Sequence, residues 1–251
     1  MSVPVLECRS LQYREDNFCL FDEVSFRLDS GQRGVILAEP HRSANALLKV
    51  CATLISPTSG QIRWFGRAVE EMSEQEIYHL RRRIGLVHRE TSLISNLTIL
   101  DNISLGLQYH NEIAREQAYD QATKLLKKFE LYEDRFLRPA QLTFEQRRLA
   151  VYARELIKQP TLFLLEHPSL DLGERVYSLL LDAFQTSTGK NGCAFLVSSI
   201  KAEVANRWGD WVLVLDEGRS ANYTGSQFDP SAYRESMRQR GLHPPGERRD
   251  E

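Results

Sequence analysis

The sequence predicts an α/β fold with an antiparallel β subdomain and an inserted α-helical subdomain. Residues 4–38 carry strand and turn patterns, whereas residues 98–156 carry a helical pattern. Apolar runs of strand length then return at 161-TLFLL-165, 194-AFLV-197 and 211-WVLVL-215. A helical segment separates the first two runs, and this alternation is typical of a parallel sheet covered by helices. The all-helical stretch is therefore an insertion into an α/β core.

The composition is that of a soluble globular protein. Of its 251 residues, 42% are hydrophobic and 26% are charged, and the net charge is −2. This balance gives no case for nucleic-acid binding. The four cysteines have no paired spacing, so we expect neither a disulfide framework nor a zinc site. A reducing compartment is therefore expected. The apolar runs are too short to span a membrane, and the N-terminus lacks a signal pattern.

The N-terminal elements follow from hydrophobic periodicity. Leu6 to Tyr13 predict one strand, and 18-FCLFDEVSFRLDSG-31 predicts a hairpin-like pair that ends at Gly31. The run Val35 to Ala38 predicts a buried strand. The segment from Ala44 to Leu54 predicts a helix whose apolar face consists of Leu47, Leu48, Cys51 and Leu54.

The middle elements have recognisable end signals. Residues 57–66 predict a turn that leads into a strand. Residues 73–83 predict a short helix in which Ser73 and Glu76 form a capping box. The four residues that follow, 84-IGLV-87, are strand-like.

The second half supplies the helices and the domain limits. Residues 114–129 predict an amphipathic helix, and residues 173–189 predict a further helix. We expect one domain over residues 1–225, with the helical subdomain at about 90–156, followed by a C-terminal helix and tail over residues 226–251. The last stretch, 241-GLHPPGERRDE-251, is polar and bears Pro and Gly, so we expect it to be disordered.

The segment between the third strand and the helix after it has the position of a phosphate-binding loop. Such a loop has the pattern G-x-x-x-x-G-K-[ST]. The residues present are 39-EPHRS-43, which contain no glycine and no lysine. The position alone does not distinguish a degenerate phosphate loop from a chance succession of strand and helix.

The rest of the chain supports the first reading, since it resembles the ATP-binding subunit of an ABC transporter over roughly residues 4–225. The resemblance rests on the order and spacing of 22-DEVSF-26, 57-PTSGQI-62, 98-TILDNISLGL-107, 153-AREL-156 and 213-LVLDEGR-219. It implies an ABC-type P-loop NTPase fold. The stretch 72-MSEQEIYHLRRRIGLV-87, followed by residues 98–107, looks most like the MlaF branch of MCE phospholipid transporters.

The family's Walker A residues are absent from the positions that the resemblance assigns to them. Glycines are expected at Ala38, His41 and Ser43, the lysine at Ala44, and the magnesium-binding hydroxyl at Asn45. Glycine permits the backbone conformation that points N–H groups at phosphates, and the lysine neutralises phosphate charge. The charge of Arg42 could replace that of the lysine, but it stands at a different position.

The other family motifs depart as well. The Q-loop glutamine falls on Arg89, the Walker B carboxylates on Glu166 and His167, the D-loop aspartate on Gly173, and the switch histidine on Ser199. The signature motif falls on Leu142, Thr143, Phe144, Glu145 and Gln146. A carboxylate at position 145 would repel a γ-phosphate. Tyr13 remains as a candidate for stacking on adenine, although a tyrosine near a strand end is common in cores.

These departures predict a pseudo-ATPase with no catalytic residue and no cofactor, in which ATP and magnesium binding are lost. Residual nucleotide binding is one alternative, and an interaction scaffold unrelated to transport is another. A third is an enzyme with remodelled chemistry and a metal held by His and carboxylate side chains. Its candidate ligands are Glu39, His41, His88, Glu166 and His167. The competing structural expectation is that no metal is bound and that Arg89 or Arg42 pairs with Glu166. We also expect Ser43 to cap the following helix.

The resemblance implies partners at the membrane. Residues 86–110 would form a groove for the coupling helix of an integral membrane permease, with contacts from Leu93, Ile94 and Leu97. Ile99 and Leu105 are further candidates for the same role, but core packing is the better interpretation for these two. The chain would lie in the cytoplasm, on the inner face of the membrane, as a homodimer or as a heterodimer with another ABC subunit. No nucleic-acid partner is expected.

Overall fold

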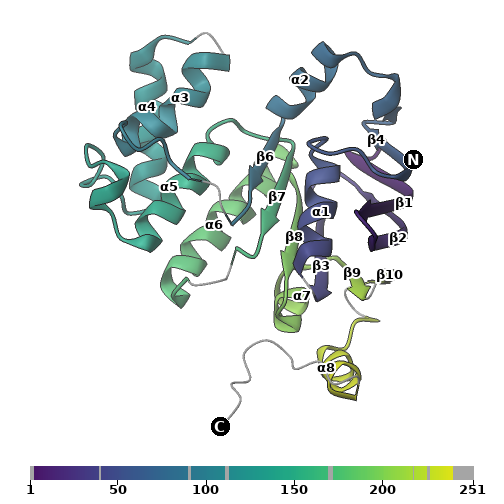
Figure 1. Cartoon of the computed structure of the whole chain (residues 1–251). Helices are drawn as coiled ribbons and strands as arrows, with labels where there is room; N and C mark the ends of the chain where they lie inside the picture. The colour runs from purple at the N-terminus through teal and green to yellow at the C-terminus, as the bar shows by residue number, and fades with distance from the viewer. Residues whose placement is uncertain are drawn as a thin grey trace.

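The computed structural model describes residues 3–39, 41–89, 92–110, 113–168, 172–216, 218–224 and 227–239. Two sheets organise this part of the chain (Figure 1). The central sheet has six strands in the order β10-β9-β3-β8-β7-β6, and a smaller sheet has four strands in the order β2-β1-β4-β5. The central strands are β3 (Arg33–Glu39), β6 (Ile84–Val87), β7 (Leu162–Glu166), β8 (Ala194–Ser199), β9 (Trp211–Asp216) and β10 (Arg219–Thr224).

The central sheet confirms the predicted parallel arrangement. β9, β3, β8, β7 and β6 pair in parallel, and β10 adds an antiparallel edge strand. The apolar runs form these strands because a parallel sheet is covered on both faces, which favours continuous hydrophobic sequence. All five residues of β7 are buried, as are all six of β8.

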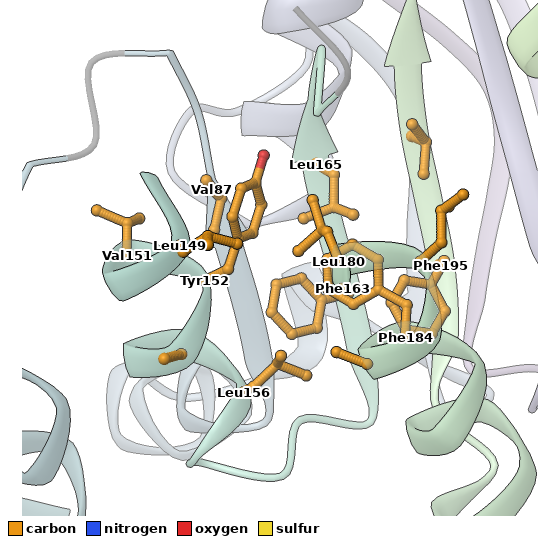
Figure 2. Packing of buried hydrophobic residues seen from close by; sticks show 14 of the residues in the cluster. Val87, Leu149, Val151, Tyr152, Leu156, Phe163, Leu165, Leu180, Phe184 and Phe195 are labelled. Atoms are coloured by element: carbon orange, nitrogen blue, oxygen red, sulfur yellow. The ribbon is translucent and has the colours of Figure 1, made fainter. Parts of the chain in front are cut away.

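The two faces of the central sheet bury different elements. Val35 and Leu37 of β3 lie in one core cluster, which also takes in α3 to α7, whereas Ile36 and Ala38 lie in a second cluster with α1 and the smaller sheet. This division follows from the two-residue period of a strand. Figure 2 shows the first cluster, in which Phe163 and Phe195 of the sheet lie beside Phe184 of α6.

The predicted hairpin-like pair at residues 18–31 is wrong, because this segment forms one strand of the smaller sheet. One long strand, β2 (Phe18–Leu28), pairs along its length with β1 (Leu6–Glu15). The predicted reversal inside this segment is absent because the strand stays paired with β1 on both sides of a local irregularity, at which Glu23 takes a left-handed φ of +50°. The sheet is completed by β4 (Ser59–Trp64) and β5 (Arg67–Ala68).

Helices fill the space around the two sheets. The capping box predicted for Ser73 and Glu76 is confirmed at the start of α2. Figure 1 shows α1 between the two sheets, and α3, α4 and α5 gathered at the other side of the molecule. The α-helices are α1 (His41–Cys51), α2 (Glu74–Arg82), α3 (Ile99–His110), α4 (Arg115–Lys128), α5 (Phe144–Leu156), α6 (Glu174–Asn191), α7 (Ala202–Trp208) and α8 (Pro230–Gln239), and 3-10 turns lie at Val69–Glu71 and Pro139–Gln141.

Among the residues described, no helix is long and apolar enough to cross a membrane. The C-terminal helix α8 packs against α7, and Arg234 of α8 forms an ion pair of 2.8 Å with Glu203 of α7. The segment predicted to be disordered, residues 241–251, lies outside the described residues.

Candidate functional site

The carboxyl ends of the central strands bring the predicted site positions to one edge of the sheet. β3 ends at Glu39, β7 at Glu166 and β8 at Ser199. These strands are parallel neighbours, with Leu37 opposite Ser199 and Glu166 opposite Ser198. In an open α/β sheet this edge is where ligands usually bind.

The junction between β3 and α1 differs from the sequence prediction. A five-residue loop was predicted from Glu39 to Ser43, but the strand continues through Glu39 and the helix begins at His41. Only Pro40, which lies outside the described residues, stands between them. Ala38 and Glu39 stay in the strand because they pair with Leu215 and Asp216 of β9.

The position of the helix changes the roles of residues 41–54. The helix begins three residues before Ala44, because residues 41–43 carry no glycine to hold them in a loop conformation. The prediction that Ser43 caps the helix is therefore wrong. Ser43 lies buried within the first turn of the helix. Leu54 does not extend the apolar face, since the helix ends at Cys51 and Leu54 is 49% exposed.

The side chains at the Walker A positions face different surroundings. Ala44, at the lysine position, is buried, and Asn45, at the magnesium-ligand position, is half-buried. Arg42 is exposed and binds Glu15 of β1, with 2.7 Å from Nε to Oε2. Arg42 therefore links α1 to the smaller sheet, and the predicted pairing of Arg42 with Glu166 is wrong. Only the backbone of His41 is described.

Glu166 is held by a backbone group. Its carboxylate is buried, and Oε2 accepts a hydrogen bond of 2.9 Å from the backbone N–H of Arg89. The guanidinium of Arg89 belongs to an exposed side chain. The prediction thus named the right residue and the wrong group. The reason is topological: β6 and β7 are parallel neighbours, so the amide after β6 reaches the carboxylate that ends β7.

His167 and Ser199 take part in the turns that follow β7 and β8. His167 is buried with a left-handed φ of +45°, and its backbone N–H donates to the carbonyl of Ser198 at 3.1 Å. This backbone region is disfavoured by about 1 kcal/mol for a residue with a Cβ. Ser199 Oγ accepts a hydrogen bond of 3.0 Å from the backbone N–H of Lys201.

The metal-binding alternative gains no support from the described side chains. Among them, no group of three His, Cys, Asp or Glu residues is placed to hold a metal ion. The side chains of Glu39 and His41, two of the five candidate ligands, are not among those described.

The signature positions form an ordinary helix start. Thr143 caps α5: its hydroxyl accepts from the backbone N–H of Gln146, and the side chain of Gln146 accepts from the backbone N–H of Thr143. Leu142 is buried in the core, whereas Phe144 is 47% exposed. Residues 142–146 thus begin a helix, and the exposed ring of Phe144 lies at its start.

Glu145 makes a contact that sequence reasoning missed. Its Oε1 accepts a hydrogen bond of 2.7 Å from the backbone N–H of Gly173, the residue that precedes α6. The carboxylate thereby lies at the positive end of a helix dipole. A side chain on residue 173 would approach Glu145 Oε1 to 3.0 Å, so glycine leaves room for the contact. Two positions that the resemblance assigned to separate nucleotide-binding motifs are thus bonded to each other within one chain.

Tyr13 packs within its own sheet. The ring stacks on Phe21 of the neighbouring strand, with centroids 5.9 Å apart and an interplanar angle of 28°. Tyr13 is half-buried, and its proposed contact with adenine stays a prediction.

The predicted permease-contact segment is organised by a buried amide. Asn102 of α3 is fully buried, and its Oδ1 accepts from the backbone N–H of Ile94 at 2.7 Å. Its Nδ2 lies within hydrogen-bonding distance of the carbonyls of Ile94, Leu97 and Thr98, at 3.0 to 3.3 Å. The signal for this role was present in the sequence as a polar residue between Ile99 and Ile103 on an apolar helix.

The three predicted contact residues differ in exposure. Ile94 is 42% exposed, whereas Leu97 is half-buried and Leu93 packs partly against the core. Of the two residues weighed against them, Ile99 is fully buried in the core and Leu105 is half-buried.

A groove of about 420 Å³ lies beside this segment, between α3 and α5. Its lining combines apolar surface with a charged cluster, in which Glu155 is paired with both Arg154 and Lys158. At the start of α3, the pKa of Asp101 is lowered: burial acts to raise it, but hydrogen bonds from Thr98 and Tyr119 outweigh burial. The groove is lined by Ile94, Leu105, Gly106, Tyr109, Arg154, Glu155 and Lys158.

Comparisons with known proteins identify the class of protein to which this fold and site belong. The ABC transporter family model matches residues 21–169, more than half of the chain. The ATP-binding cassette MJ0796, solved as a dimer in a post-hydrolysis state with ADP and Pi, superposes with a TM-score of 0.80 at 21% identity. The match covers 89% of this chain and 100% of that chain. The structure of cbiO1 from Clostridium perfringens has a TM-score of 0.78 at 19% identity, over 94% of each chain.

Relatives found by sequence are about one quarter identical to this chain. The lipoprotein-releasing system ATP-binding protein LolD of Chromohalobacter salexigens is 25% identical over 86% of this chain and 92% of its own length. The methionine import ATP-binding protein MetN of Haemophilus influenzae is 26% identical over 79% of this chain. The matched part spans 57% of the MetN length. The chain belongs to the ABC transporter family, and the predicted ABC-type P-loop NTPase fold is confirmed.

Replacing the buried amide of Asn102 should destabilise the protein. The substitution Asn102→Ala removes the hydrogen bonds to Ile94 and Leu97 and leaves part-buried backbone groups without these partners. We expect a loss of about 3 kcal/mol in the free energy of unfolding, measured by urea denaturation. The exposed Asn96→Ala in the same loop is the control and should change it by less than about 0.5 kcal/mol. Equal effects of the two substitutions would contradict the role of Asn102.

Removing the carboxylate of Glu145 should weaken the start of α6. We expect Glu145→Ala to cost about 1 kcal/mol in the free energy of unfolding, as for the loss of a helix cap. The control is Glu174→Ala, which removes another acidic side chain from the first turn of α6, one that is 86% exposed. Urea denaturation of both variants tests the contact, and a Glu145→Ala variant as stable as the wild type would argue against it.

Proposed function

We propose that this chain is a catalytically degenerate ABC subunit that neither binds nor hydrolyses ATP. In this proposal it serves as a structural or regulatory component on the cytoplasmic face of a membrane permease, within a lipid-transport complex of the MCE type. The observation that carries the proposal is the junction at residues 39–41, where strand and helix nearly meet. A phosphate group needs a loop of consecutive backbone N–H donors at that position.

The junction bears on nucleotide binding in two ways. A P-loop wraps phosphates between the strand and the helix, and here only one residue separates them. The lysine that would neutralise the phosphates is replaced by the buried Ala44, and the nearby cation, Arg42, is paired with Glu15. Binding a triphosphate would therefore require the start of α1 to unwind.

The remaining motif positions support the same proposal. The carboxylate of Glu166, which would hold magnesium, accepts a bond from Arg89, and Glu145 accepts one from Gly173. His167 is a poor substitute for the carboxylate that would activate water. In a head-to-tail dimer each nucleotide site would draw one half from this chain, so a homodimer or a heterodimer would have two impaired sites.

The groove beside Ile94 supports a permease as the partner. It combines exposed apolar side chains, Ile94 and Tyr109, with the charges of Arg154, Glu155 and Lys158. A short amphipathic helix fits such a surface, because its apolar face can bury Ile94 while its polar groups reach these charged side chains.

The lipid substrate rests on sequence resemblance. Residues 72–87 and 98–107 look most like the MlaF branch, and one relative is by name a lipoprotein-releasing system ATP-binding protein. The MetN relatives are named for methionine import.

Retained nucleotide binding is the second candidate function. It is favoured by the relatives, which are named as ATP-binding proteins, and by Glu166, which keeps a carboxylate at the end of β7. Under this reading the chain would bind ATP in an atypical manner as part of a transporter.

A binding titration separates the two candidates. We expect no saturable binding of a fluorescent ATP analogue with magnesium up to about 1 mM, an affinity of only ~4 kcal/mol. Ala44→Lys alone should not restore binding, because the backbone donors would still be missing. The matched comparison is a variant with the whole motif rebuilt: Ala38→Gly, His41→Gly, Ser43→Gly, Ala44→Lys and Asn45→Ser. Micromolar binding by the wild type would refute the loss of nucleotide binding.

Membrane association tests the permease partner. We expect the full chain to be recovered with the membranes of its native cells, and Ile94→Asp to release it because a carboxylate cannot enter an apolar contact. Tyr78→Asp is the control, since Tyr78 is 52% exposed on α2, away from the groove. A wild-type chain absent from the membrane fraction would favour the scaffold alternative instead.

A further inference from the structure

Two of the four cysteines lie in contact in the core. Cys8 of β1 is 1% exposed and Cys51 of α1 is 0% exposed, and their Sγ atoms are 4.0 Å apart. They stand 43 residues apart in the sequence, so their spacing does not reveal the pair. Both belong to the core cluster that α1 forms with the smaller sheet, whereas Cys193 lies in the cluster on the other face of the central sheet. The pair is therefore a product of the packing of α1 on β1.

Local patterning directs both side chains to this interface. Cys8 stands opposite Phe26 of β2 and Ile62 of β4, so these three residues share one face of the smaller sheet, and all three are buried. Cys51 lies one turn after Leu47 on the apolar face of α1. The register of the sheet and the helical period thus hold the two thiols next to each other in a packed core.

Two contacts hold the ends of α1 to β1. At the start of the helix, Arg42 pairs with Glu15, but both side chains are exposed, and an exposed ion pair contributes little to stability. At the end of the helix, Cys51 touches Cys8. In the reduced state this second contact is a weak one, because a thiol is a weak donor and a weak acceptor. A covalent bond at this point would fix α1 to the smaller sheet.

The surroundings of the pair favour a neutral product of its chemistry. The cluster consists of hydrophobic side chains, and burial raises the pKa of the Cys8 thiol, an effect to which the neighbouring Cys51 adds. Two thiolates that held a monovalent soft metal ion would leave an uncompensated negative charge in this apolar setting, which is costly. A disulfide carries no charge and needs no hydrogen-bond partner. The environment therefore favours a disulfide over a metal site.

We propose that Cys8 and Cys51 form a redox-responsive crosslink, which a peroxide oxidises to a disulfide. The thiolate of one cysteine attacks a peroxide oxygen and breaks the O–O bond, which gives a sulfenic acid and a hydroxide that takes up the proton of that thiol. The sulfur of the other cysteine then attacks the sulfenic sulfur, forms the S–S bond and releases water. In total the two thiols lose two electrons and two protons, and one hydrogen peroxide becomes two waters. Each Sγ atom has to move by only about 1 Å to reach bonding distance.

Cys51 is placed where the helix can open. It is the last residue of α1, and Leu54 beyond it is 49% exposed. Helix ends unfold locally without global unfolding, and hydrogen peroxide is small and uncharged, so it reaches the pair during such openings. Because the Cys8 thiol stays protonated and the pair is usually closed, the reaction is slow. The crosslink therefore responds to sustained oxidation, and it does not depend on whether the chain binds ATP.

The test is oxidation of the folded full-length chain by hydrogen peroxide. After the treatment, free thiols are blocked with iodoacetamide, and peptide mapping by mass spectrometry without reduction locates any disulfide. We expect a peptide pair joined through Cys8 and Cys51, and a fall from four free thiols to two. The Tm should rise by about 4–8 °C, because the bond closes a long loop of the unfolded chain, and dithiothreitol should reverse the rise.

Alanine substitutions supply matched controls. Cys8→Ala and Cys51→Ala should each prevent the crosslink and the rise in Tm. Cys193→Ala truncates a cysteine that is equally buried, at 1% exposed, and should leave the crosslink intact. In urea, the same oxidation of the wild type should give mixed pairings, because the unfolded chain does not select one pair.

The decisive result comes from the wild-type chain and does not require any variant to fold. Retention of all four thiols in the folded protein, or a disulfide through Cys19 or Cys193, would overturn the proposal. A chain joined through Cys8 and Cys51 with an unchanged Tm would refute the role of the bond in fixing α1 to the smaller sheet.

Discussion

The parallel register of β3, β8 and β7 is the constraint on which the rest of the structure depends. These strands are buried on both faces, so none can shift by a residue without moving apolar side chains from one core cluster to the other. Their alignment brings Glu39, Glu166 and Ser199 to one edge and Arg33 and Phe195 to the other. The candidate site is a consequence of where these strands end.

At the carboxyl edge, polar groups in the family's nucleotide-binding positions bond to the protein itself. Glu166 accepts from Arg89, and Glu145 of the helical subdomain accepts from Gly173 beside α6. Two further contacts reach α6: an ion pair between Arg175 and Glu130, which follows α4, and a hydrogen bond from Lys128, at the end of α4, to Thr186. Together these contacts tie the helical subdomain to the core.

The proposed permease groove is shaped by a contact within the chain itself. The groove beside Ile94 is held in shape from within by Asn102, so its form does not require a bound nucleotide. Under the proposed function, a subunit without ATP chemistry can therefore still present this surface to a membrane partner.

Local patterning by itself determined the fold class. The apolar runs of β7, β8 and β9 indicated a parallel sheet, and Ser73 with Glu76 marked the start of α2, because burial and capping act between residues close in sequence. Only the tertiary structure decided the site. The helix start at His41 depends on the pairing of Glu39 with β9, and the partners of Arg42, Glu166 and Glu145 lie 27, 77 and 28 residues away. Contacts over such separations are set by which strands are neighbours, and no local pattern in the sequence records that.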